Sequence, residues 1–172
     1  MNEAGTRAID CPDEAATLRL GECLARAIEP PFIIFLQGDL GAGKTTLARG
    51  LIRTLGVQGA IKSPTFTLVE PYQTARFAVY HFDLYRVADP QELELAGLRD
   101  YLAENALILI EWPERAAGLN LVPDMQLSLA PSAVDGRSVE IATSTPAGAA
   151  VLARLAPCLT QHQALDRSGK LT

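Results

Sequence analysis

A lysine and a threonine at the end of a glycine-rich segment carry the clearest chemistry in this sequence. Residues 38–45, GDLGAGKT, fit the pattern of Gly, four residues, Gly, Lys and Ser or Thr. In such a loop the glycines let successive backbone N–H groups converge on a phosphate without a Cβ in the way. Lys44 would contact the outer phosphates as a point charge, and the Thr45 hydroxyl would ligate the accompanying Mg²⁺. The pattern therefore predicts that the chain binds a nucleoside triphosphate through its phosphates.

A carboxylate at the end of an apolar run supplies a second candidate metal ligand. Residues 106–110, ALILI, are all apolar and are followed at once by Glu111. A carboxylate at this position is costly to bury unpaired, so a metal or a hydrogen-bond donor must lie near it. The arrangement is typical of a Walker B strand, which lies beside the strand that precedes the glycine-rich loop and whose terminal acid reaches Mg²⁺ directly or through water. Trp112, the next residue, is predicted to be a packing or lid residue.

A second acidic residue stands near the end of another predicted strand. Residues 76–86 alternate with the period of a strand, which places His81 and Asp83 on one face and a set of apolar residues on the other. Ligands gather near the ends of strands in open α/β sheets, so Asp83 is a candidate for the reaction. The pattern leaves open whether it is instead a cap or a salt-bridge partner of Arg86, and it favours a structural role for His81.

The segment Ser63-Pro64-Thr65 follows the helix that the glycine-rich loop would begin. Two interpretations remain open at this point. The segment is either a plain turn into a strand at residues 65–69, or a switch whose hydroxyls sense the terminal phosphate and Mg²⁺.

The elements that would position these residues alternate between strands and helices. We expect strands at residues 32–36, 65–69, 78–84, 106–112, 125–130 and 137–143, and helices at residues 12–29, 45–55, 90–96, 98–103 and 146–156. The strands at residues 125–130 and 137–143 are joined through Val134-Asp135-Gly136, and this pattern predicts a hairpin. The fold class predicted is α/β: a single P-loop NTPase-like domain with a mixed, centrally parallel sheet flanked by helices and a C-terminal β-hairpin.

Length and composition narrow the possibilities further. The chain has 172 residues, 48% of them hydrophobic, which suits one domain over residues 1–160 with a polar tail at residues 161–172. A net charge of -5 argues against broad contact with nucleic acids or membrane surfaces. Without an apolar signal core or membrane span, a cytoplasmic location is expected. Cys11, Cys23 and Cys158 are odd in number and widely separated, and we expect reduced thiols.

The order of the motifs GDLGAGKTT, KSPTFTLVEPY, YHFDLYR, DPQELELAGLRDY and LILIEWPE closely resembles that of the TsaE family, formerly called YjeE. This family is the ATPase component of bacterial tRNA threonylcarbamoyladenosine (t6A) synthesis. The resemblance runs from about Pro12 to Arg154. A glycine-rich loop alone would indicate only an NTPase, whereas the later blocks in this order are specific to the family.

The resemblance implies roles for particular residues. ATP and Mg²⁺ would be held by Asp39, Leu40, Gly41, Ala42, Gly43, Lys44, Thr45 and Thr46. Thr45 and Glu111 would be the metal ligands, and Asp83 would join Lys44 and Glu111 as a catalytic residue needed for turnover. Glu14 and Arg137 would contact the adenine side of the nucleotide.

The resemblance also implies partners. TsaB and TsaD would act with this chain, TsaD transferring the threonylcarbamoyl group to an adenosine of tRNA. ATP hydrolysis by the chain alone would be slow, and no tRNA site of its own is expected.

Three other functions stay open at the level of the sequence. A P-loop small-molecule kinase would need an acceptor pocket and an arginine-rich lid, and the arginines here are scattered. A GTPase would need an Asn-Lys-X-Asp segment to read guanine, which the sequence lacks, so adenine is favoured. A nonhydrolysing scaffold would use ATP only to shape a docking surface.

Overall fold

A seven-stranded mixed sheet runs through the structure, a computed structural model that describes residues 5–132 and 135–168, with the backbone alone over residues 161–168. Its strand order is β1-β7-β6-β2-β5-β4-β3. The strands are β1 (Thr6–Cys11), β2 (Phe32–Gln37), β3 (Val69–Gln73), β4 (Ala78–Asp83), β5 (Leu107–Glu111), β6 (Met125–Pro131) and β7 (Arg137–Thr143).

The centre of the sheet is parallel and its margins are antiparallel. Strand β2 pairs in parallel with both β5 and β6, and β4 pairs in parallel with β5. Strands β3, β7 and β1 pair antiparallel with their neighbours, and β6 and β7 form the C-terminal hairpin. The fold class expected from the sequence is therefore confirmed, including the position of the Glu111 strand directly beside the strand that precedes the glycine-rich loop.

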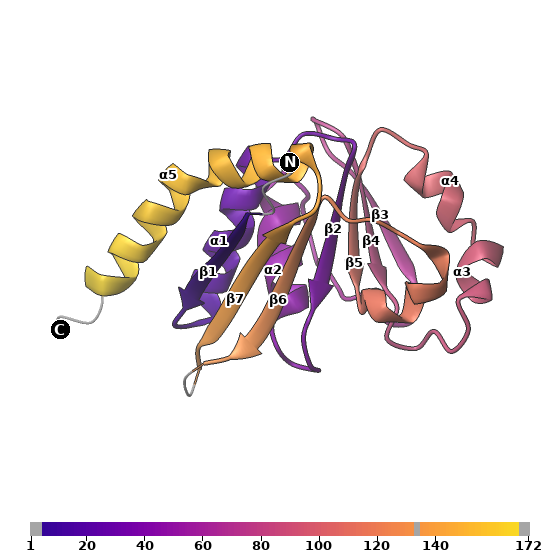
Figure 1. Cartoon of the computed structure of the whole chain (residues 1–172), viewed down its shortest axis with the longest axis horizontal. Coiled ribbons are helices and arrows are strands. Elements are labelled where there is room, and N and C mark those ends of the chain that lie inside the picture. Colours follow the sequence, from indigo (N-terminus) through magenta and orange to yellow (C-terminus); the bar gives the residue numbers. More distant parts are fainter. Residues whose placement is uncertain (1–4, 133–134, 169–172) are drawn as a thin grey trace.

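The helices divide between the two faces of the sheet. They are α1 (Glu14–Ala27), α2 (Lys44–Thr54), α3 (Gln91–Leu95), α4 (Leu98–Leu102), the 3₁₀ segment η1 (Pro113–Leu119) and α5 (Pro146–Ser168). Figure 1 shows α5 and α1 at one end of the molecule and α3 and α4 at the other.

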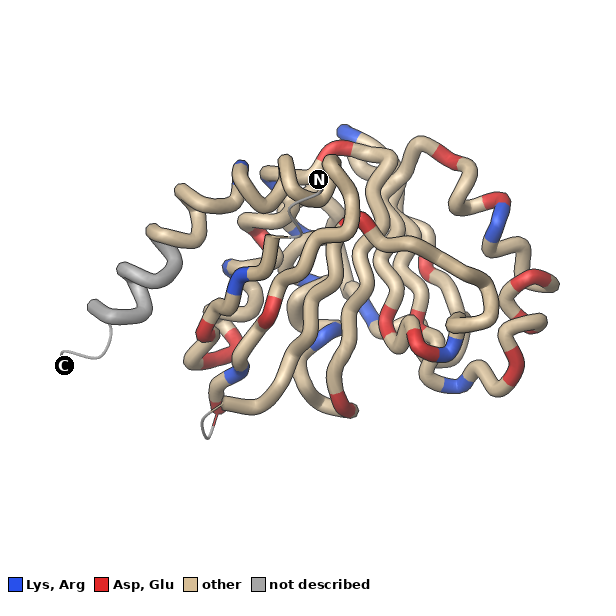
Figure 2. The backbone as a smooth tube through the Cα atoms, viewed as in Figure 1, with Lys and Arg blue, Asp and Glu red and all other residues tan. Residues whose placement is uncertain are grey.

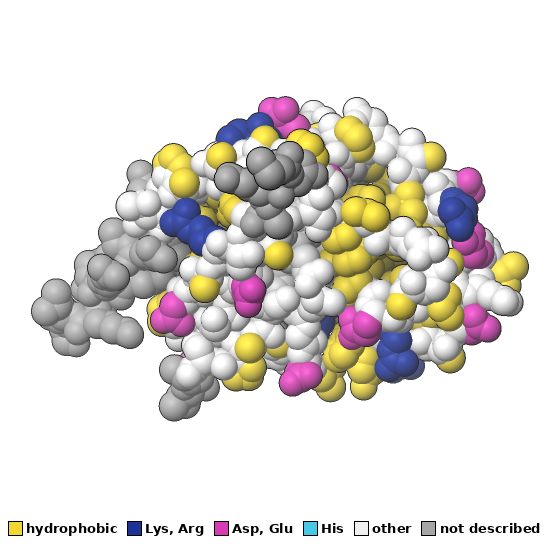
Figure 3. All heavy atoms as spheres, in the orientation of Figure 1, with side chains coloured by type: hydrophobic (Ala, Val, Ile, Leu, Met, Phe, Trp, Pro, Cys, Tyr) yellow, Lys and Arg dark blue, Asp and Glu magenta, His cyan; other side chains and the backbone are white. Residues whose placement is uncertain are grey.

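Each face of the sheet has its own apolar core. Ile34 and Leu109 belong to a cluster with α1, α2 and α5, whereas their strand neighbours Phe35 and Ile110 belong to a second cluster with α3, α4 and η1. The second core is covered less completely, since Ile33 and Leu121 pack against it but are only partly buried. On the face viewed in Figure 3, apolar side chains gather in a hollow near the middle of the molecule.

Helices α1 and α2 pack unusually close together. A Cβ added to Gly50 of α2 would overlap the carbonyl oxygen of Leu18 in α1. Because α2 begins at the glycine-rich loop, this contact fixes the loop relative to the first core.

Several element boundaries differ from the expectation. Strand β1 was not predicted from the sequence, and it pairs with β7 at the edge of the sheet. The strand predicted at residues 65–69 is wrong over its first part: the N–H groups of Thr67 and Leu68 both donate to the carbonyl of Pro64, which closes a turn, and β3 begins only at Val69.

The end of the chain also differs from the expectation. Helix α5 does not stop near residue 156 but continues to Ser168 with Pro157 inside it, so the backbone of residues 161–168 is helical. Residues 169–172 of the expected tail lie outside the described residues, as does Val134 of the expected hairpin turn.

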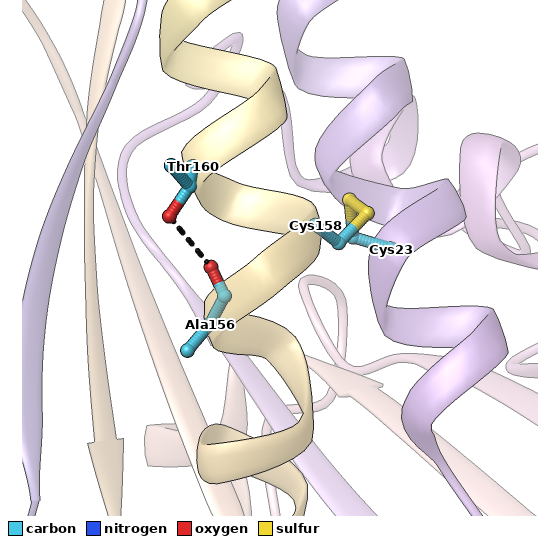
Figure 4. Close-up of a disulfide and its surroundings, with 4 residues drawn as sticks. All are labelled: Cys23, Ala156, Cys158 and Thr160. Atoms are coloured by element: carbon cyan, nitrogen blue, oxygen red, sulfur yellow. Dashed lines mark hydrogen bonds between the residues drawn. A yellow bond between two sulfur atoms is a disulfide. The ribbon is translucent and has the colours of Figure 1, made fainter.

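The expectation of reduced thiols is wrong for two of the three cysteines. Cys23 of α1 and Cys158 of α5 form a disulfide across a Cα–Cα distance of 5.8 Å, which Figure 4 shows between the two helices. Cys11 is buried in the first core. The pairing was missed because the two residues are separated by 135 positions, and only the docking of α5 on α1 brings them together.

In the described part of the chain, no helix has both the length and the apolar character needed to cross a membrane.

Candidate active site

The residues predicted to bind the nucleotide and to take part in the reaction converge at the ends of the parallel strands. A pocket of about 320 Å³ opens there, and it is lined by residues of the glycine-rich loop, of α2 and of the segments that end β4 and β5. Its polar lining includes Lys44, Thr45, Ser63, Thr65, Asp83 and Glu111. Residues separated by more than 60 positions thus meet because β2, β5 and β4 run in parallel and end at the same edge.

The glycine-rich loop joins β2 to α2 and holds its own lysine. Lys44 is only 4% exposed, and its Nζ donates to the carbonyls of Gly38 at 2.6 Å and Asp39 at 2.9 Å. The ammonium also lies 4.1 Å from the centre of the Trp112 ring. Burial lowers the pKa of Lys44, and the carboxylates of Glu111 and Asp83 oppose this effect. A phosphate placed over the loop would meet a cation that is already directed by the backbone.

Glu111 lies against the first turn of α2. The residue is 2% exposed, and the Thr45 hydroxyl donates to its carboxylate with distances of 3.0 Å to Oε1 and 3.2 Å to Oε2. A hydroxyl that gives its single proton to a carboxylate keeps its lone pairs for a cation. Magnesium is commonly held by one or two carboxylates or hydroxyls together with the phosphates of its nucleotide. Thr45 and Glu111 therefore fit the expected ion.

Asp83 is the centre of a second hydrogen-bonded group. Its Oδ2 accepts from the hydroxyls of Ser63 at 2.6 Å and Thr65 at 2.8 Å, and its Oδ1 accepts from the N–H of Tyr85 at 3.0 Å. The predicted alternative of a salt bridge to Arg86 is not the arrangement observed, since that guanidinium lies over the Phe66 ring instead. The segment 63–65 is thus tied to the site through its hydroxyls.

The two acidic side chains lie next to each other in the sheet. Asp83 and Glu111 are register partners in the parallel β4–β5 pair and are 5% and 2% exposed. Two buried carboxylates on adjacent strands require hydrogen-bond donors or cations near them. Hydroxyls, one backbone N–H and the nearby Lys44 provide them here.

A second pocket of about 540 Å³ adjoins the first beside the glycine-rich loop. Glu14, Gly41, Ala42 and Arg137 line it, and Arg137 lines the first pocket as well. Arg137 Nε donates to the carbonyl of Ala42 at 3.1 Å, while Glu14 lies 3.6 Å from Arg49 of α2. Glu14 and Arg137 therefore line the same pocket beside the loop, a pocket that Glu111 does not line.

The other residues predicted from the loop occupy different positions around these pockets. Leu40, Gly43 and Thr46 line the first pocket, and Leu40 is 75% exposed at its rim. Asp39 contributes its carbonyl to Lys44, and its side chain is exposed.

Two residues of the site, His81 and Tyr85, were not predicted to belong to it, and Trp112 was predicted only as a packing or lid residue. His81 is fully buried, and its Nε2 donates to Glu111 Oε1 at 2.9 Å. Tyr85 and Trp112 line the first pocket, with their rings 5.0 Å apart. The strand period had already placed His81 on the face of Asp83, and the register with β5 that would have given it a partner cannot be read from one strand.

Comparisons with known proteins identify the family of this chain. The profile of the family described as "Threonylcarbamoyl adenosine biosynthesis protein TsaE" matches residues 11–139. The protein of that name from Haemophilus influenzae is 44% identical over 142 residues, covering 80% of this chain and 89% of the relative. The one from Rickettsia felis is 42% identical over 118 residues, covering 68% of each chain.

A solved structure shares the fold. The crystal structure of Bacillus subtilis YdiB superposes with a TM-score of 0.76 at 23% identity, covering 91% of this chain and 98% of that one.

Proposed function

The chain belongs to the TsaE family of tRNA threonylcarbamoyladenosine biosynthesis, and from this premise we propose that it binds ATP with Mg²⁺ and hydrolyses it slowly in support of that modification. The observation that carries the proposal is the convergence of Lys44, Thr45, Asp83 and Glu111 on one pocket at the ends of three parallel strands. A glycine-rich loop supplies phosphate binding, and the two buried carboxylates supply the means to hold a metal and to position water.

Binding is the task of the loop and of the start of α2. The N–H groups of the loop and Lys44 hold the phosphates, and Lys44 exchanges the carbonyls of Gly38 and Asp39 for phosphate oxygens. The Thr45 hydroxyl and Glu111, which are hydrogen-bonded to each other, would hold the ion. The chemistry that Mg²⁺ would supply there is neutralisation of phosphate charge.

Turnover is the task of Asp83. Its carboxylate lies at the edge of the same pocket and holds the hydroxyls of Ser63 and Thr65. In our proposal it orients the attacking water or couples the segment 63–65 to the γ-phosphate. Phosphoryl transfer depends mainly on positioning and on stabilising charge, and a partner that completes or orders such a site raises the rate by about 10³- to 10⁵-fold.

The proposed partners are the TsaB and TsaD proteins, acting as a TsaB–TsaD complex in the cytoplasm. This part of the proposal rests on the family's place in the pathway. Direct tRNA binding by this chain is not part of the proposal, because its net charge is -5.

Calorimetric titration with ATP and with GTP, in the presence of Mg²⁺, tests the binding step. We expect ATP to bind the wild type, GTP to compete poorly, and Lys44→Ala to lose binding. Asp83→Ala should bind ATP yet fail to release phosphate. An exposed control, Arg99→Gln on α4, should match the wild type.

Two results would argue against the proposal. Loss of ATP binding in Asp83→Ala would contradict the role assigned to this residue. ADP formation that needs an added small-molecule acceptor, with the phosphoryl group transferred to that acceptor and no free phosphate released, would favour a kinase. Support of tRNA modification by Asp83→Ala and Glu111→Gln would favour the nonhydrolysing scaffold.

A further inference from the structure

His81 is a buried polar residue for which the proposed function has assigned no role. It sits in β4, two residues before Asp83, and no part of its side chain is exposed. Its register partner in β5 is Leu109, so that the His81 side chain emerges on the face of the sheet that α2 covers. This is the face on which Glu111 meets Thr45.

The two nitrogens of the His81 ring have different surroundings. Nε2 lies 2.9 Å from Glu111 Oε1, whereas Nδ1 is buried with no hydrogen-bond partner in the described part of the chain. A carboxylate only accepts, so Nε2 must carry the proton of this contact. A buried ring nitrogen without a partner costs free energy, which indicates that the ring is placed for its Nε2 contact.

The contact from Thr45 does not select one oxygen of Glu111. Its distances to Oε1 and Oε2 differ by only 0.2 Å, from 3.0 to 3.2 Å, so this hydroxyl alone leaves the carboxylate free to rotate between similar arrangements. His81 breaks the equivalence because it contacts Oε1 alone. Oε1 then has two donors, and Oε2 keeps most of its lone-pair capacity.

From this geometry we infer that His81 is a positioning residue that fixes the rotation of the Glu111 carboxylate and so presents Oε2 to the Mg²⁺ of the nucleotide. The inference rests on the proposed function and extends it to a residue outside the pocket lining. Partners that orient a metal-binding carboxylate in this way are worth about 10- to 100-fold in metal affinity.

Two polar substitutions separate this role from simple packing. In His81→Gln the amide nitrogen occupies the place of Nε2 and can still donate to Glu111. In His81→Asn the amide is one carbon shorter and ends near the place of Nδ1, so it does not reach. His81→Leu removes the donor altogether, and Val79→Ala on the same face of β4 is a control for loss of core packing.

The experiment measures ATP affinity by calorimetry for each variant, once with Mg²⁺ and once with EDTA. In EDTA, we expect His81→Leu and His81→Asn to bind ATP with the affinity of the wild type. The increase in ATP affinity that Mg²⁺ produces should require a Mg²⁺ concentration at least about 10-fold higher in these two variants. His81→Gln should recover most of that gain. Val79→Ala should lose stability but keep the Mg²⁺ dependence of the wild type.

Other outcomes are decisive in different ways. If His81→Asn and His81→Gln show the same Mg²⁺ dependence, or if binding in EDTA falls as much as binding with Mg²⁺, the inference is wrong and His81 is structural. Should His81→Leu not fold, the Gln and Asn pair still decides. A wild type whose ATP affinity ignores Mg²⁺ would overturn the proposed function, and this inference with it.

Discussion

Gly43, the residue before Lys44, occupies a backbone conformation that other residues rarely adopt. Its φ is +104°, and a Cβ placed on it would overlap the guanidinium of Arg137. Gly41 has a φ of +81°, and nothing lies within 4 Å of a Cβ there. A non-glycine residue would therefore be strained by the positive φ at either position, and only at Gly43 would its Cβ also overlap a neighbouring side chain.

We predict that Gly41→Ala lowers the free energy of unfolding by about 1–3 kcal/mol, the usual cost of a left-handed non-glycine residue. Gly43→Ala should lose more, because the Arg137 side chain must also move. In an Arg137→Ala background the two alanine variants should become equal in denaturant unfolding. A Gly43→Ala variant that is no less stable than Gly41→Ala would contradict the overlap.

Individual site residues could be predicted from the sequence where they belong to a local pattern. Residues whose contacts depend on the register between strands were missed. Lys44 and Thr45 can be identified from their spacing in the glycine-rich loop, and Glu111 can be identified from its position directly after an apolar run. The contacts of His81 with Glu111 and of Ser63 with Asp83 span 30 and 20 residues. Such contacts depend on how β4 and β5 are aligned, which no single segment specifies.

Among the elements, the packing of α2 on α1 depends on Gly50. Alanine is preferred to glycine in helices by about 1 kcal/mol, so Gly50→Ala would stabilise an isolated helix. The overlap with the Leu18 carbonyl opposes this, and overpacking costs about 1–3 kcal/mol or more where backbone must move. We predict a net loss of stability in denaturant unfolding, together with weaker ATP binding because α2 carries the loop.

The control for this variant is Arg53→Ala, an exposed position on the same helix. It should leave both stability and ATP binding nearly unchanged. Gly50→Ala with the stability of the wild type would show that the two helices can separate without cost.

Strand β4 and the segment after α4 are linked by a buried tyrosine. The Tyr80 hydroxyl donates to Glu104 Oε2 at 2.6 Å, and this hydrogen bond is the main reason why the pKa of Tyr80 is raised above its usual 10.0. The unfolded chain then releases the tyrosine proton before the folded chain does. The contribution of this group to stability is therefore complete below pH 10 and is lost as the pH rises further.

We predict that Tyr80→Phe is less stable than the wild type by about 1 kcal/mol at pH 8. The difference should shrink in urea unfolding experiments carried out above pH 10, because only the wild type loses the contribution. A difference that stays constant up to pH 11 would argue against the link between Tyr80 and Glu104.

Elements with strong internal patterns were predicted and elements defined by their neighbours were not. Strand β5 is a run of aliphatic residues and α2 follows a glycine-rich loop, so both elements can be predicted from their own sequence. Strand β1 is stabilised by pairing with β7, and the turn at residues 65–68 is held by hydrogen bonds to Pro64 and Asp83. These features depend on contacts that form only in the folded chain.

In the molecule as a whole, the Cys23–Cys158 disulfide links α1 to α5, two helices whose buried residues belong to the first core. It closes a loop of 135 positions by linking α5 to α1. Cross-links over long loops stabilise proteins mainly by restricting the unfolded chain, and removing one from a small domain costs about 2–5 kcal/mol. We predict a loss of this size in denaturant unfolding when a dithiol reductant is added.

A variant with both Cys23→Ser and Cys158→Ser should have the stability of the reduced wild type and should not respond to the reductant. Mass spectrometry after alkylation verifies the state of the thiols in each sample. A wild type whose alkylated cysteines increase on reduction while its stability stays constant would refute the stabilising role.

The surface charge of the molecule is uneven. Acidic residues outnumber basic ones along residues 89–104, which include α3 and α4, as Figure 2 shows. This end of the molecule is a poor match for the phosphates of a nucleic acid. The negative charge therefore agrees with the proposal that the output of ATP hydrolysis reaches tRNA through other proteins.

In our proposal, the pocket around Lys44, Asp83 and Glu111 is an ATPase site that partner proteins complete. Phosphate release from ATP, measured for the chain alone and with TsaB and TsaD, tests it most directly. We predict slow release alone, a large acceleration by the partners together, and no acceleration in Asp83→Ala. Fast release by the chain alone, unchanged by TsaB and TsaD, would contradict the claim.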